Sequence, residues 1–100
     1  MLLAVDVGNT QTVFGLYDAD KLGERWRIAT EAQRTGDELG SLLSDFVDFA
    51  VLEGICLSST VPRLITEYEH VAERWAKVQS FEIATRREAI AGPRMLTLAP

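Results

Sequence analysis

The sequence predicts a mixed α/β domain, in which a three-stranded antiparallel meander is followed by helices that alternate with further strands. Apolar and β-branched runs separated by turn residues fill residues 1–29. Two segments with apolar residues at helical spacing come next, and a short apolar run follows each of them. Strands that alternate with helices usually form a parallel sheet with right-handed crossovers.

Composition agrees with one globular domain. The chain has 100 residues, of which 47% are hydrophobic and 25% charged. Its formal net charge of −5, without a basic stripe, argues against nucleic acid or an anionic membrane surface as the main partner. The apolar start ends at Asp6 without a basic leader, and no run is long enough to span a membrane, so we expect a cytoplasmic protein. Cys56 is the only cysteine and lies in an apolar run, which predicts a buried, unreactive thiol.

The first part of the chain has the pattern of a meander. Leu2–Val7 is an apolar run that ends at a turn signal, and we expect a central strand buried on both faces. Thr12–Tyr17, rich in β-branched and aromatic residues, should pair with it as a hairpin. After a turn at Asp18–Lys21, polar and apolar residues alternate over Arg25–Ala29, as on an outer strand.

The next segment changes to a helical period. Thr35 and Glu38 have the spacing of a capping box, which predicts a helix from this point through about Val51. Its apolar face would consist of Leu39, Leu42, Leu43, Phe46, Val47 and Ala50. Strand character resumes over Gly54–Ser59.

A second helix should begin at Pro62, because proline is well tolerated in the first turn. Its apolar stripe would be formed by Leu64, Ile65, Tyr68, Val71, Ala72 and Trp75. Val78–Ala84 is a candidate fifth strand. The order β-β-β-α-β-α-β is a ribonuclease-H-like layout, for which we expect one phosphate-binding domain over residues 1–88 and an irregular or truncated tail over 89–100.

Two tryptophans and one histidine have structural interpretations. Trp26 and Trp75 lie on the predicted apolar faces, so we expect core or interface residues. His70, flanked by Glu69 and Glu73, is expected to be an exposed helical residue rather than a catalytic base. None of them carries the functional prediction.

The turn after the first strand is the strongest candidate site. Asp6 ends that strand, at the sheet edge where open α/β sheets usually bind ligands. Gly8 allows a positive φ and close backbone approach, Asn9 tolerates the left-handed region, and Thr10 adds a hydroxyl, so several N–H groups could face an anion. Because a carboxylate repels phosphate, Asp6 implies a bridging Mg²⁺ ion.

A second wall of this site is predicted at Ser58, Ser59 and Thr60. If their strand lies parallel to the first, these hydroxyls sit beside Asp6, with the positive end of the Pro62 helix behind them. A purely structural interpretation is open for both segments. The first could be an ordinary hairpin turn, and the hydroxyls could only cap the helix.

The first strand and its hairpin have the sequence Leu2-Leu3-Ala4-Val5-Asp6-Val7-Gly8-Asn9-Thr10-Gln11-Thr12-Val13-Phe14-Gly15-Leu16-Tyr17. This run closely resembles the amino terminus of type III pantothenate kinases. The resemblance continues through Trp26–Glu31, Thr35–Leu39 and Leu57–Pro62, and covers most of residues 1 to about 85. It implies the fold of the actin, hexokinase and Hsp70 superfamily. The implied activity is ATP-dependent phosphorylation of pantothenate, the first step of coenzyme A synthesis, by a dimeric enzyme.

Carried over to this sequence, the resemblance implies a metal and phosphate role for Asp6. It also implies an ATP phosphate loop made of Gly8, Asn9, Thr10 and Thr12, with Ser58, Ser59 and Thr60 lining the cleft. The implied cofactors are ATP and Mg²⁺, with a monovalent cation as an additional candidate. In such a kinase, positioning and charge neutralisation matter more than covalent chemistry.

The sequence departs from the family after its fifth predicted strand. The family's Gly-Ala-Asp-Arg motif, which carries the base that activates pantothenate, has no counterpart in Glu88–Pro100. The catalytic base and the pantothenate-binding residues are therefore unassigned, and we expect the chain to need a carboxyl-terminal half or a homo-oligomer. The alternative is a noncatalytic binding module of the same fold. A downstream reading frame that encodes the missing motif would favour the kinase.

Overall fold

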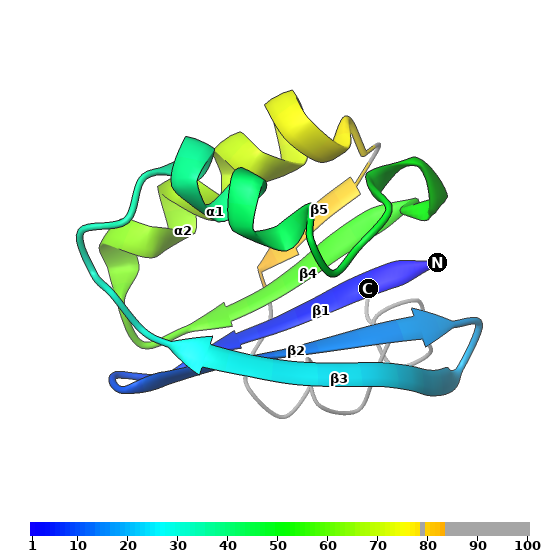
Figure 1. Ribbon diagram of the computed structural model, residues 1–100, viewed down its shortest axis with the longest axis horizontal. Coiled ribbons are helices and arrows are strands. Elements are labelled where there is room, and N and C mark those ends of the chain that lie inside the picture. The colour runs from blue at the N-terminus through cyan, green and yellow to red at the C-terminus, as the bar shows by residue number, and fades with distance from the viewer. Residues whose placement is uncertain (79, 84–100) are drawn as a thin grey trace.

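The computed structural model describes residues 1–78 and 80–83, which form two layers (Figure 1). One layer is a five-stranded sheet with the strand order β3-β2-β1-β4-β5. Helices α1 (Gly36–Leu43) and α2 (Pro62–His70) lie together on one face of it. The α/β prediction is confirmed, whereas the predicted boundary at residue 88 and the tail over 89–100 lie outside the described residues.

The sheet contains the meander and the parallel strands that the sequence predicts. Strand β1 (Leu2–Val7) pairs with β2 (Gln11–Asp18), and β2 with β3 (Lys21–Ala29), both antiparallel. On its other side β1 pairs in parallel with β4 (Gly54–Ser59), which pairs in parallel with β5 (Ser80–Ile83). The bounds of β1 and β4 are as predicted, β3 begins earlier than expected, and Ala84 of the predicted fifth strand lies outside the described residues.

The expected burial of β1 on both faces is only partly correct. Leu3, Val5 and Val7 point toward the helices and have no exposed surface. On the opposite face Ala4 is buried, but Leu2 and Asp6 are only partly buried. The reason is that both helices of the described part pack on the same face of the sheet (Figure 1).

Helix α1 begins as predicted but ends early. The capping box is present, since Thr35 Oγ1 accepts a hydrogen bond from the Glu38 amide at 3.2 Å and Glu38 Oε1 accepts one from the Thr35 amide at 3.1 Å. The predicted extension to Val51 is wrong, because α1 ends at Leu43.

Polar side chains beyond Leu43 compete for the backbone groups that a longer helix would use. Ser44 Oγ donates to the Ser41 carbonyl at 2.6 Å, and Asp48 accepts from the Ala50 amide at 3.0 Å as the cap of a short 3₁₀ turn, η1 (Phe49–Val51). Val47 still reaches the core, whereas Phe46 is 48% exposed. Apolar residues therefore continue at helical spacing in the sequence beyond Leu43, where the helix itself ends.

Helix α2 carries the predicted apolar stripe. Pro62 occupies its first turn, and wider π-helical turns, η2 (Val71–Ala76), continue it. Leu64, Tyr68, Val71 and Ala72 are buried, while Ile65 and Trp75 are partly buried against the same core. The thiol of Cys56 is buried, as predicted.

The two helices approach closely at two glycines of α1. A Cβ on Gly36 would come within 3.0 Å of the His70 ring, and one on Gly40 would do the same to the Trp75 ring. Asp37 Oδ1 lies 3.0 Å from His70 Nε2 and accepts a hydrogen bond from Trp75 Nε1 at 3.1 Å. These hydrogen bonds, that of His70 above all, lower the pKa of the Asp37 carboxyl. His70 is thus only partly exposed, because its ring lies at the contact between the two helices.

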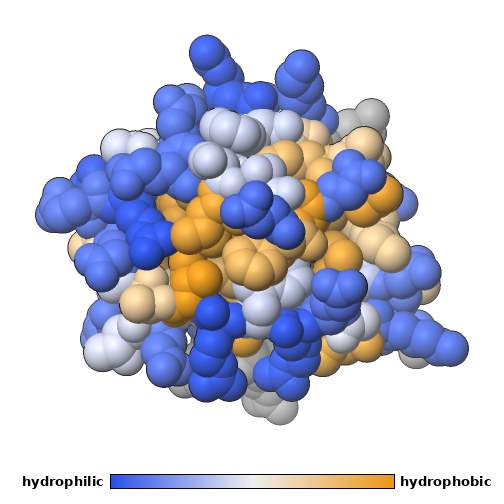
Figure 2. Space-filling view, in the orientation of Figure 1, coloured by the Kyte–Doolittle hydropathy of each residue, from blue (hydrophilic) through white to orange (hydrophobic). Residues whose placement is uncertain are grey.

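An apolar surface is visible where α1 meets the strands (Figure 2). Phe46 stacks on Trp26 with the ring centroids 5.5 Å apart, and Trp26 stacks on the buried Phe14 at the same distance. Trp26 and Trp75 both pack against the core, as expected. No helix in the described part of the chain is long and apolar enough to cross a membrane.

Candidate functional site

The predicted site residues gather at one end of the sheet. There β1 and β4 end side by side, β2 begins, and α2 starts immediately beyond β4 (Figure 1). The parallel register pairs Asp6 with Ser58 and Val7 with Ser59. The first strand, its hairpin and the segment of Ser58, Ser59 and Thr60 therefore meet at one end of the sheet, as expected.

The hairpin loop consists of Gly8, Asn9 and Thr10. The Gly8 amide donates to the Gln11 carbonyl at 2.9 Å, which closes the turn. A Cβ on Gly8 would lie 3.0 Å from that same oxygen, so the close approach of the backbone favours glycine at this position. Asn9 tolerates the left-handed region but does not adopt it, because in the described residues only Ala19 and Lys77 combine a side chain with a positive φ.

Two threonines outside the hairpin hold it in place. The Thr60 amide donates to the Val7 carbonyl at 2.9 Å, and Thr60 Oγ1 lies 3.2 Å from both that carbonyl and Asn9 Oδ1. On the other side, the Thr30 amide donates to the Thr10 carbonyl at 2.9 Å. The loop is thus tied to β4 and to the end of β3, which limits the freedom of its N–H groups.

The hydroxyls before α2 do not cap that helix. Its N-cap is Val61, and no side chain in the described part of the molecule caps it. Ser59 Oγ instead accepts a hydrogen bond from the Val61 amide at 2.9 Å, one residue before the helix. The interpretation of Ser59 and Thr60 as plain helix caps is therefore wrong, and the positive end of α2 lacks a neutralising side chain among these residues.

Asp6 and Ser58 lie on the sheet face opposite the helices. Ser58 is 6% exposed, and Asp6 is partly buried beside it. Asp6 also borders a hollow of about 110 Å³, lined in addition by residues that include Ala4, Gly15, Leu22 and Arg25. No group of three potential metal ligands occurs among the described residues, so Asp6 would have to share Mg²⁺ with phosphate oxygens and water. This donor set fits magnesium, which commonly uses one or two carboxylates together with substrate phosphates.

Thr12 is separated from the other predicted site residues. Its side chain is 1% exposed, and its Oγ1 lies 2.8 Å from Thr30 Oγ1. Thr12 is opposite Val7 in the sheet, so it faces the helices, whereas Asp6 and its neighbour Val13 face away. Of the predicted loop residues, Gly8, Asn9 and Thr10 lie together near the surface and Thr12 does not.

Sequence reasoning missed two kinds of residue at this end of the sheet. Thr30 binds the hairpin, and no local pattern marks it as a partner of Thr10. Arg25 and Arg27 project from β3 on the same face as Asp6, because they pair with Gly15 and Val13. The alternation with Trp26 and Ile28 could have placed both arginines on one face.

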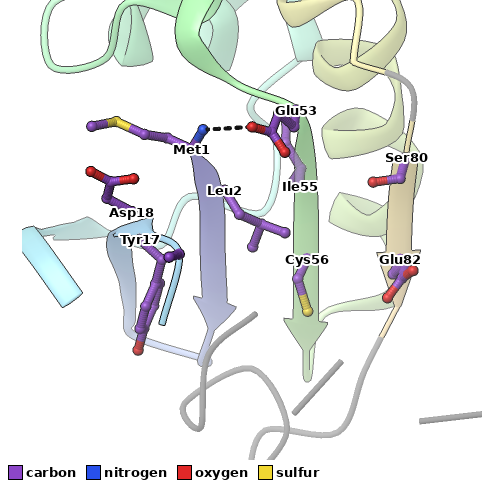
Figure 3. A pocket seen from close by; sticks show the side chains of 10 residues that line it. Met1, Leu2, Tyr17, Asp18, Glu53, Ile55, Cys56, Ser80 and Glu82 are labelled. Atoms are coloured by element: carbon purple, nitrogen blue, oxygen red, sulfur yellow. Dashed lines mark hydrogen bonds and ion pairs between the residues drawn. The ribbon is translucent and has the colours of Figure 1, made fainter. Parts of the chain in front are cut away.

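A larger hollow, of about 440 Å³, lies at the opposite end of β1 and β4. Figure 3 shows Asp18, Glu53 and Glu82 around it, and the Met1 ammonium contacts Glu53 at 3.5 Å. Its three carboxylates would repel an anionic ligand. The hairpin end is therefore the better candidate for phosphate.

The Thr60 hydroxyl offers a direct test of the hairpin. On the hypothesis that this loop binds the phosphates of MgATP, replacing Thr60 with valine should weaken that binding about threefold to tenfold, because Asn9 loses a hydrogen bond while the Thr60 amide still holds Val7. Titration followed by NMR or calorimetry would measure the dissociation constant. Thr60→Ser keeps the hydroxyl and should bind as the parent does, whereas equal loss in both variants would contradict a role of the hydroxyl.

Comparison with known proteins adds an independent observation. The family model described as type III pantothenate kinase matches residues 2–95. The type III pantothenate kinase of Exiguobacterium sp. strain AT1b is 42% identical over an alignment of 84 residues, and the match covers 79% of this chain and 33% of that protein.

Two relatives from other bacteria are also type III pantothenate kinases and match a similar share of the chain. The type III pantothenate kinase of Streptomyces griseus is 43% identical over 84 residues, covering 75% of this chain and 32% of the relative. That of Myxococcus xanthus is 38% identical over 84 residues, covering 79% and 33% respectively. The chain thus spans about a third of the length of these curated relatives.

Proposed function

The chain belongs to the type III pantothenate kinase family, and we propose that it forms the amino-terminal, ATP-phosphate-binding part of an enzyme that phosphorylates pantothenate. The observation that carries this proposal is the meeting of the β1 hairpin, the end of β4 and the uncapped start of α2 at one end of the sheet. Strand ends and helix N-termini of this kind are suited to anions.

We further propose that the fold is ribonuclease-H-like. The strand order β3-β2-β1-β4-β5, with an antiparallel meander beside parallel strands, fits that layout. Residues 1–88 would form this domain.

Within the proposed site, the phosphates of ATP would lie against the loop formed by Gly8, Asn9 and Thr10. Asn9 Oδ1 faces Thr60 Oγ1, which leaves the amide nitrogen of Asn9 as a donor for phosphate oxygens. The start of α2 would add its positive end, and Ser58 and Ser59 would line the cleft. These groups orient the phosphates and offset their charge, which is the main task in phosphoryl transfer.

Asp6 is the proposed protein ligand of Mg²⁺. When bound, the ion would neutralise the negative charge that the carboxylate and the phosphates bring together. Asp6 itself would fix the position of the triphosphate relative to the sheet edge. A monovalent cation is a further proposed cofactor, and we assign none of the described residues to it.

The group that activates the pantothenate hydroxyl is proposed to come from the sequence that the longer relatives carry after this region. Such a chain would work with a carboxyl-terminal part, and as a homo-oligomer, in the cytoplasm. The exposed Phe46 and the partly buried Trp26 beside it are consistent with an apolar contact to another protein surface.

A hybrid enzyme tests the proposed function. Residues 1–84 of this chain would replace the matched segment of the Streptomyces griseus relative, with which 43% of 84 residues are identical. The hybrid should phosphorylate pantothenate with ATP, and the 100-residue chain alone should not. Coupled detection of ADP with labelled pantothenate measures both.

The outcomes separate the kinase from a noncatalytic module. A folded hybrid that neither binds MgATP nor phosphorylates pantothenate would favour the noncatalytic alternative. Turnover by the isolated chain would contradict the assignment of the base to the longer relatives' sequence. A hybrid carrying Ser41→Ala, an exposed change on α1, serves as the control for the effects of substitution itself.

A further inference from the structure

We propose that Thr12 is a positioning residue, which holds the phosphate hairpin through a chain of hydroxyl groups formed by the buried Tyr68 and Thr12 and the partly buried Thr30. The inference rests on the proposed function, because it concerns how the ATP-phosphate loop keeps its shape. It assigns Thr12 a role different from the direct phosphate contact that the family resemblance implies.

The three hydroxyls connect three elements of the fold. Tyr68 lies on α2 with 1% of its surface exposed, and a hydrogen-bond interaction with the Thr12 side chain partly opposes the rise that burial causes in the pKa of Tyr68. Thr12, on β2, is equally buried and lies 2.8 Å from Thr30 Oγ1. Thr30 follows the end of β3, and its amide donates to the Thr10 carbonyl of the hairpin at 2.9 Å.

Burial makes this chain sensitive to the loss of any member. A hydroxyl can donate one hydrogen bond and accept two, so the buried hydroxyls of Tyr68 and Thr12 depend on their neighbours in the chain for hydrogen bonds. Burial raises the pKa of Tyr68, so its hydroxyl stays protonated throughout the physiological range. Removing the Thr12 hydroxyl would leave both Tyr68 and Thr30 without this partner.

The orientation of Thr12 argues against direct contact with a ligand. Its cross-strand neighbour is Val7, which has no exposed surface, and both face the helices. Asp6, the proposed magnesium ligand, faces the other side of the sheet. A phosphate beside Asp6 and Gly8 would have to displace core residues to reach Thr12 Oγ1.

The hydroxyl chain therefore connects α2 to the hairpin loop, which lies at the start of this helix. A helix end and a hairpin that move together keep their N–H groups in a fixed arrangement before the nucleotide arrives. Such preorganisation reduces the entropy that binding would otherwise lose.

Two variants far apart in the chain test the proposal. Thr12→Val and Tyr68→Phe each remove one hydroxyl and keep the side-chain shape, so both should fold. Hydrogen exchange of the Thr30 amide, measured by NMR on the 100-residue chain without ligand, should accelerate about threefold to tenfold in each variant relative to the Leu57 amide. The double variant should be no faster than the faster single one, because both changes break the same chain.

Nucleotide binding provides the second measurement. MgATP should bind about threefold to tenfold more weakly to each single variant, and Thr12→Ser should restore most of the loss. Ile55→Val, at the other end of the core, is the matched control, and it should alter neither the relative exchange of Thr30 nor the affinity.

The two measurements distinguish the possible failures. If Thr12→Val weakens MgATP binding while Tyr68→Phe changes neither property, Thr12 contacts phosphate directly and the proposal is wrong. Unchanged exchange of Thr30 in both variants also overturns it. If exchange accelerates as expected but the unsubstituted chain and the hybrid bind no MgATP, the hydroxyl chain is supported and the proposed function fails.

Discussion

Replacing Asp6 with asparagine is expected to lower the turnover of the hybrid enzyme by about two orders of magnitude or more. Asparagine keeps the size of the side chain and its place beside Ser58, but removes the negative charge that would hold Mg²⁺. On the proposed role of Asp6, the metal and the triphosphate would then lose their common anchor at the sheet edge. Steady-state rates over a series of Mg²⁺ concentrations would show a large loss, together with a higher Mg²⁺ requirement.

A second aspartate provides the matched control for this change. Asp45 is exposed in the segment after α1, so Asp45→Asn alters the net charge equally at a distance from the hairpin. It should leave both the rate and the Mg²⁺ dependence unchanged. A hybrid with Asp6→Asn that keeps the parent rate and the parent Mg²⁺ dependence would refute the metal role of Asp6.

Replacing Gly40 with valine is expected to destabilise the isolated chain by about 3 kcal/mol, a large part of the stability of a domain this size. Trp75 occupies the space where a side chain on Gly40 would lie. The indole would have to move, and its hydrogen bond to Asp37 at 3.1 Å would be lost with it. Urea unfolding followed by circular dichroism would measure the change in the free energy of unfolding.

The next residue of the same helix separates this clash from helix propensity. Ser41 is exposed, and Ser41→Val introduces the same β-branched side chain without a neighbour to displace. It should cost less than about 1 kcal/mol. Equal destabilisation by the two substitutions would mean that close helix packing at Gly40 is not the cause.

The packing of α1 and the proposed phosphate site are connected through α2. Gly36 and Gly40 let α1 lie close to His70 and Trp75, and the Gly36 amide also donates to Glu67 Oε1 at 2.8 Å. Glu67 and Tyr68 are adjacent on α2, the helix whose start faces the hairpin. The packing of α1 therefore supports the helix on which the proposed hydroxyl chain depends.

Local chemistry decided much of the fold, and this part could be predicted from the sequence. The capping box of Thr35 and Glu38, the apolar run of β1 and the proline at the start of α2 each act within a few residues. The same holds for the hairpin, whose glycine and position at the end of a strand predict a ligand site there. The pairing of β1 with β4 then followed from the order of the elements.

Only the tertiary structure decided where α1 ends and what the threonines do. The apolar spacing after Leu43 suits a longer helix, but Ser44 and Asp48 bind the backbone there, and Val47 reaches the core from beyond the end of α1. Thr12, Thr30 and Thr60 carry the same hydroxyl and are told apart by burial and by partners distant in the chain. Sequence alone therefore determined that a hairpin follows the first strand, and it predicts phosphate as the ligand of that hairpin. Which hydroxyls lie at its surface and which hold it from within depends on long-range packing, because burial and hydrogen-bond partners arise only when the sheet and α2 come together.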